Sequence, residues 1–106
     1  MPNPLPFVWK EISDYMEIMQ VNNQTKEIMT ILQEEAAEVI VEISKCLRFG
    51  ISEDNLNRLN KELGDLQLMI DLLVDEEIGV THGKIFNAKI QKIEKLMTYS
   101  NIDLSV

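Results

Sequence analysis

Apolar residues recur at steps of three and four along much of the chain. This spacing is the period of a helix that buries one face. No segment of useful length shows the strict alternation that is typical of a β-strand. The sequence therefore predicts an all-α protein. The first apolar stripe consists of Met29, Leu32, Ala36, Val39, Ile43 and Leu47, and the second of Leu56, Leu59, Leu63, Leu66, Ile70 and Leu73.

Local signals at the ends of these patterns predict four helices. All three prolines lie within the first six residues, and the rest of the chain is free to form long helices. Gly50 suits the position that ends a helix, and Ser52 and Thr81 suit N-caps. The expected helices run from about Pro6 to Gln20, Gln24 to Arg48, Ser52 to Ile78 and His82 to Tyr99.

The short loop around Gly50 predicts that the two central helices form an antiparallel hairpin. A chain of 106 residues suits a single domain, here taken as residues 1–106. Its apolar stripes exceed what a short four-helix chain can hide. We therefore expect a four-helix bundle-like fold that is completed by oligomerisation, as a homodimer or as a tetramer built from dimers.

Acidic residues recur beside both stripes. Glu35 lies about 70° from the centre of the first stripe and Glu38 about 130° from it. Glu62 and Asp65 repeat these offsets on the same side, 27 positions later. In an antiparallel hairpin the two acidic pairs come level, and four carboxylates should converge at the border of the core.

Four crowded carboxylates need a counter-charge, because they cannot all stay ionised without one. Hard divalent cations prefer oxygen ligands, and Mg²⁺ is the usual one where phosphate completes the shell. Di-iron bundles use a Glu-x-x-His pattern, whereas the single histidine of this chain, His82, is far from both pairs. The pattern favours Mg²⁺, or alternatively Mn²⁺, over iron.

The overall charge narrows the range of partners. The net charge of −8 argues against non-specific binding to nucleic acid or to anionic membranes. No apolar run is long enough to span a membrane, and the N-terminus does not have the pattern of a signal peptide. The single cysteine, Cys46, rules out an intramolecular disulfide and fits a reducing compartment. We expect a cytoplasmic protein.

The paired acids also resemble a known family. E-x-x-E at Glu35 and Glu38, the spacer 39–61, and E-x-x-D at Glu62 and Asp65 resemble the motif of the all-α nucleoside triphosphate pyrophosphohydrolases, the MazG-like superfamily. "EEAAEVIVEISKCLRFG" and "NKELGDLQLMIDLL" look like the two central helices of that family. The resemblance covers roughly residues 24–75.

The resemblance implies Mg²⁺-dependent attack of water on a nucleoside triphosphate, giving a monophosphate and pyrophosphate. It implies that Glu35, Glu38, Glu62 and Asp65 are metal ligands, with Glu34 as a candidate base, or as a residue that supports the ligands, beside the catalytic Glu35 and Glu38.

The resemblance also implies a substrate-binding set. Lys45, Lys89 and Lys92 match basic positions near the phosphates, and Trp9 resembles an aromatic that stacks on the base. No G-x-x-x-x-G-K-[ST] loop occurs to support cleavage at the γ-phosphorus, so attack at the α-phosphorus is expected.

Other interpretations stay open at this point. The acids could form a solvated flank on a non-catalytic helical interaction module. Trp9 could pack in a core or an interface, and the lysines of the last helix could be a solvated face. A neighbouring chemistry on the same fold is hydrolysis of phosphoribosyl-ATP.

Overall fold

The computed structural model describes residues 21–105, which contain helices and connecting segments and no strand. The helices are α2 (Asn23–Phe49), α3 (Glu53–Val74) and α4 (His82–Tyr99). The all-α prediction is confirmed for this part of the chain. The helix expected at 6–20, with Trp9, lies outside the described residues. None of the three helices is long and apolar enough to cross a membrane.

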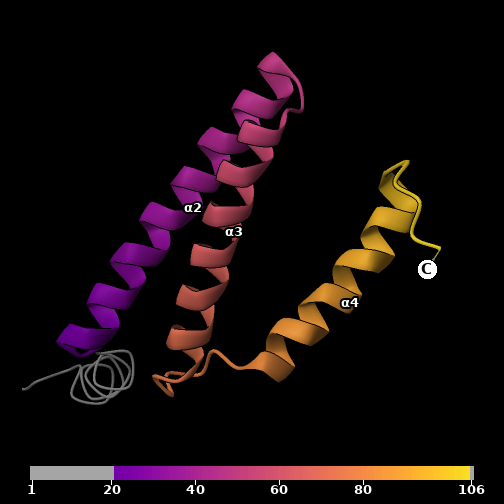
Figure 1. The fold of residues 1–106 in the computed structure, drawn as a ribbon. Coiled ribbons are helices and arrows are strands. Elements are labelled where there is room, and N and C mark those ends of the chain that lie inside the picture. Colours follow the sequence, from indigo (N-terminus) through magenta and orange to yellow (C-terminus); the bar gives the residue numbers. More distant parts are fainter. Residues whose placement is uncertain (1–20, 106) are drawn as a thin grey trace, which may run out of the picture.

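Helices α2 and α3 lie side by side as an antiparallel hairpin (Figure 1). Its turn is fixed by the predicted caps. Gly50 ends α2 with φ 91°, a left-handed value that favours glycine. The Ser52 hydroxyl accepts a hydrogen bond from the Asn55 backbone N–H at 3.1 Å, and Asn55 Nδ2 donates to the Gly50 carbonyl at 2.9 Å. The side chain of Asn55 therefore braces the turn from inside the next helix.

Helix α3 ends at Val74, so the prediction that it continues to Ile78 is wrong. Residues 75–77 are all acidic, and the last turn of α3 contains no basic residue. Acidic side chains are unfavourable at a helix C-terminus, where the helix dipole is negative. The chain instead turns at Glu77, which has φ 57°.

A side-chain clamp closes the open end of the hairpin. Glu76 accepts hydrogen bonds from Gln24 Nε2, at 2.8 Å, and from the Thr25 hydroxyl. Thr25 is 1% exposed, so its hydrogen bond with Glu76 is partly shielded from water, whereas the one from Gln24 is exposed. The clamp explains why the acidic residues after Val74 fold back instead of extending the helix.

The two helices meet along a narrow seam with heptad-like spacing, as in a coiled coil. Ile28, Met69 and Leu73 form its buried apolar cluster, against which Leu32 and Val80 pack. Polar residues interrupt the seam on both helices. The seam comprises Thr25, Ile28, Leu32, Glu35, Val39 and Glu42 on α2, and Asn55, Leu59, Glu62, Leu66, Met69 and Leu73 on α3.

The predicted apolar stripes match this seam only in part. Met29, Ile43, Leu47, Leu56 and Leu63 belong to those stripes but are exposed in this chain. Two packed helices bury only one narrow strip on each other. The predicted stripes were instead centred on the apolar positions of each helix. The remaining apolar positions form a second face that the hairpin does not cover.

Helix α4 stands away from the hairpin, joined to it by residues 75–81 (Figure 1). It contains no buried residue. Phe86, Ile90, Ile93 and Met97 recur along one side of α4 and are exposed. Residues 21–105 thus form a hairpin and an outlying helix, and a four-helix bundle is not formed within them.

Candidate metal site

Three of the four predicted metal ligands come together near the middle of the hairpin. Glu35 from α2 and Glu62 and Asp65 from α3 each offer one carboxylate oxygen, and these oxygens lie within 4.8 Å of one another. All three residues are half-buried. We call these three residues the acidic group. Carboxylates at this spacing from two helices form a donor set that suits a hard divalent cation.

The other two predicted acids lie elsewhere on α2. Glu38 and Glu34 are exposed and do not belong to the acidic group. After Glu35 the next seam residue is Val39, and Glu38 is rotated about 100° from Val39 around α2, on the exposed side. The expected convergence of four carboxylates is therefore observed for three. The ligand role of Glu38 and the base role of Glu34 stay predictions.

Lys61 supplies a counter-charge to the acidic group. Its Nζ lies 2.8 Å from Asp65 Oδ2 and 3.5 Å from Glu62 Oε1. The hydrogen bond and the charge of Asp65 raise the pKa of Lys61. We did not predict this residue, although a lysine four positions before an aspartate on a helix is a known pairing signal. Lys61 and a bound cation would compete for the same carboxylates.

Glu35 is the acid most affected by its surroundings. Burial is the main cause that raises its pKa, followed by a hydrogen bond with Glu62 and by the negative charges of Asp65 and Glu62. Its Oε2 atom is buried and has no hydrogen-bond donor within residues 21–105. A proton or a cation at this position would relieve the repulsion among the three carboxylates.

The raised pKa of Glu35 gives a prediction for stability. A carboxyl whose pKa is raised by folding stabilises the protein below its ordinary pKa of 4.5, and this contribution is lost as the pH rises through the folded pKa. Glu35→Gln should therefore raise the melting temperature of the metal-free protein at neutral pH. This gain in melting temperature should vanish below pH 4.5. Thermal unfolding followed by circular dichroism in chelator tests this. Glu27→Gln, an exposed acid on α2, should have little effect at either pH; a lower melting temperature for Glu35→Gln would contradict the account.

A second prediction concerns Lys61. Lys61→Met removes a cation that competes for Asp65 and Glu62, so the affinity for Mn²⁺ should increase. The side chain is 68% exposed, so solvent weakens its ion pairs and the gain should be only about two- to fivefold. Titration followed by electron paramagnetic resonance measures it, with Lys26→Met as the control. Weaker Mn²⁺ binding by Lys61→Met would show that the lysine does not oppose the metal.

The predicted substrate-binding residues are not gathered at the acidic group. Lys45 lies toward the hairpin turn, where its Nζ is 3.4 Å from Glu42 Oε1. Lys89 and Lys92 are exposed on α4, away from the hairpin (Figure 1). Trp9 is outside the described residues. Of the predicted substrate-binding residues that lie within 21–105, Lys45 alone is on the same hairpin as the acids.

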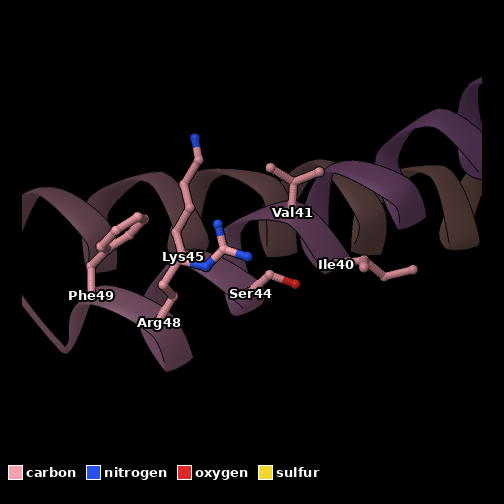
Figure 2. Close-up of a pocket in the computed structure, with 6 residues that line it drawn as sticks. All are labelled: Ile40, Val41, Ser44, Lys45, Arg48 and Phe49. Carbon is pink, nitrogen blue, oxygen red and sulfur yellow. The ribbon is translucent and has the colours of Figure 1, made fainter.

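A shallow depression of about 260 Å³ lies on α2 near the hairpin turn. Figure 2 shows its six side chains, all from this one helix. The depression contains no member of the acidic group, so it is not the candidate metal site. It is lined by Ile40, Val41, Ser44, Lys45, Arg48 and Phe49.

Residues 21–105 thus define an all-α protein with a half-buried acidic group across a helical hairpin. The chain matches no protein-family model, no curated protein and no solved structure. The functional argument therefore rests on the motif and on the geometry of the site.

Proposed function

We propose that this protein is a Mg²⁺-dependent nucleoside triphosphate pyrophosphohydrolase, in line with its resemblance to the MazG-like superfamily. The observation that supports this most is the placement of the acids. Residues from both halves of the double motif, Glu35 on one helix and Glu62 and Asp65 on the other, bring oxygens within 4.8 Å. A solvated acidic flank would not require three half-buried carboxylates facing one another across a seam.

The donor set fits a divalent cation. Glu35, Glu62 and Asp65 would hold Mg²⁺, or alternatively Mn²⁺, and the buried Glu35 Oε2 without a donor is available as a ligand atom. When bound, Mg²⁺ offsets the charge of phosphate oxygens and lowers the pKa of a coordinated water. Water and phosphate oxygens would complete the shell, because three carboxylates leave positions free.

The remaining predicted residues take roles around this centre. Glu38 lies one turn from Glu35, where it is a candidate for a further ligand, and the neighbouring Glu34 is a candidate base. Lys45 and, from α4, Lys89 and Lys92 would neutralise phosphates, and Trp9 would stack on the base. We propose attack at the α-phosphorus, so that pyrophosphate leaves as a unit.

Product analysis tests this function. Ribo- and deoxyribonucleoside triphosphates, together with phosphoribosyl-ATP, are incubated with the protein and Mg²⁺, and the products are separated by anion exchange. We expect monophosphate and pyrophosphate in equal amounts for at least one nucleotide, and none with Asp65→Asn prepared identically. If phosphoribosyl-ATP alone is cleaved, the protein is a phosphoribosyl-ATP pyrophosphohydrolase instead. Diphosphate with orthophosphate would contradict attack at the α-phosphorus.

Exposed apolar surface supports a second proposal, that the chain forms a homodimer or a tetramer built from dimers. Ile40 and Leu47 on α2 are 65% and 83% exposed, and the apolar side of α4 is uncovered. Contiguous exposed apolar surface is typical of an interaction site. A non-catalytic helical interaction module would use the same surface, and absence of turnover across the nucleotide panel would favour it.

The oligomer is expected at micromolar concentration. Sedimentation equilibrium should give the mass of two or four chains, because association would bury the apolar side of α4 and the uncovered face of the hairpin. Ile90→Asp places a charge within that surface and should shift the population toward the monomer, whereas Lys95→Asp on the same helix should not. A wild-type protein that sediments as a monomer would contradict the proposal.

We also propose a cytoplasmic location, since the chain has a single cysteine and so no intramolecular disulfide.

A further inference from the structure

A second group of charges lies in the seam, between the acidic group and the hairpin turn. Glu42 is only 5% exposed. Its Oε1 lies 3.4 Å from Lys45 Nζ, and its Oε2 lies 3.4 Å from Arg58 Nε across the seam. Glu42 Oε2 is buried and receives no hydrogen bond within residues 21–105. Arg58 and Glu42 were not among the residues that we predicted from the sequence.

Arg58 is held from two directions. Besides its ion pair with Glu42, its Nη2 donates to Asn55 Oδ1 at 2.6 Å. Asn55 is itself buried and bonded to the hairpin turn. The side chain of Arg58 is nevertheless 50% exposed, and that of Lys45 is 44% exposed. Both cations are therefore partly open to solvent while each is paired with Glu42.

The stability of the fold is a weak explanation for the pairing of Glu42 with Lys45 and Arg58. The Glu42 carboxylate loses its hydration on burial, and solvent weakens the ion pairs that it makes with two half-exposed cations. Here two cations share one carboxylate, so the three side chains carry a net charge of about +1 (two positive, one negative). A half-exposed excess of positive charge suits an anion, and the planar guanidinium of Arg58, held by Glu42 and Asn55, matches phosphate oxygens.

The location relates this group to the candidate metal site. Arg58 precedes Glu62 by four residues, which is about 6 Å along α3. Glu42 follows Glu35 by seven residues, which is about 10 Å along α2. An anionic chain that is held by a metal at the acidic group could therefore reach Arg58 along the same seam.

We propose that Arg58, with Lys45, binds the terminal phosphate of the substrate, and that Glu42 is a positioning residue that holds Arg58 in place. This role for Arg58 rests on the proposed function, because it assigns a further residue to the same nucleotide site. It specifies the substrate class as one with an extended polyphosphate, since a chain of phosphates can span from the acidic group to Arg58.

Direct binding of tripolyphosphate separates this proposal from the catalytic one. Calorimetric titration without metal should show binding by the wild type and about tenfold or more weaker binding by Arg58→Met. Glu42→Gln makes the group more positive, so binding weaker than that of the wild type, which we expect, would show that Glu42 acts by positioning Arg58. Arg48→Met is the matched control, since that arginine is also near the hairpin turn but lies over the Phe49 ring. Arg58→Lys keeps the charge and should retain part of the affinity. Circular dichroism confirms that each variant is folded.

Kinetics and metal binding complete the test. For a nucleotide that is turned over, Arg58→Met should raise KM about tenfold or more and leave kcat and Mn²⁺ affinity nearly unchanged. If no nucleotide is turned over, selective loss of tripolyphosphate binding in Arg58→Met would still support the subsite. Equal binding by Arg58→Met and Arg48→Met, or no binding by the wild type, would overturn it.

Discussion

Asp65→Asn and Glu62→Gln are each expected to lower kcat/KM for the nucleotide substrate by about a hundredfold or more. Metal-assisted charge stabilisation contributes several kcal/mol to hydrolysis of this kind, and either substitution removes a ligand from a group of three. The helical fold should persist, because Glu62 is one of the polar residues of the seam and Asp65 lies beside the seam, so neither substitution removes an apolar contact. Steady-state assays of the purified variants measure the effect.

The control for these variants is Asp54→Asn. Asp54 is an exposed acid in the first turn of α3, outside the acidic group, and its substitution should leave kcat/KM within about twofold of the wild type. Glu38→Gln adds information, because a loss comparable to that of Asp65→Asn would show that Glu38 joins the metal shell when the cation binds. Wild-type rates in both Asp65→Asn and Glu62→Gln would refute the assignment.

Leu73→Ala is expected to destabilise the hairpin by about 2–4 kcal/mol. Leu73 is 8% exposed and belongs to the small apolar cluster with Ile28 and Met69. Few other apolar side chains within residues 21–105 can compensate for the lost contacts, so a large share of the stability of the hairpin should be lost. Urea unfolding followed by circular dichroism measures the change in the free energy of unfolding.

Gln67→Ala, at an exposed position of the same helix, should change the free energy of unfolding by less than about 0.5 kcal/mol. If Leu73→Ala unfolded at the same urea concentration as Gln67→Ala, the cluster around Leu73 would not be the core of the hairpin.

Local signals were sufficient to predict most helix boundaries. Ser52 and Thr81 cap α3 and α4 as expected, and Gly50 ends α2, because each signal acts within a few residues. The end of α3 could not be predicted in this way. It depends on the contact of Glu76 with Thr25, which are 51 positions apart in the sequence.

The candidate site was predictable to the extent that helical spacing determines it. The repeated acid-x-x-acid pattern placed Glu35, Glu62 and Asp65 near one another, as observed. The pattern could not show that Glu38 lies apart from these three side chains, because its position depends on which narrow strip of α2 contacts α3. Lys61 and Arg58 were missed because charged residues on a helix are usually solvated, and only the packing shows which of them face acids.

Direct binding of Mn²⁺ tests the central claim, that the acidic group is a divalent metal site, without any knowledge of the substrate. Electron paramagnetic resonance follows free Mn²⁺ as the protein is added, and Mg²⁺ is then added as a competitor. We predict saturable binding that Mg²⁺ displaces, that is greatly weakened in Glu62→Gln and Asp65→Asn, and that is unchanged in Asp54→Asn and Glu27→Gln. Saturable binding that is equal in all of these variants, or no saturable binding by the wild type, would contradict the account.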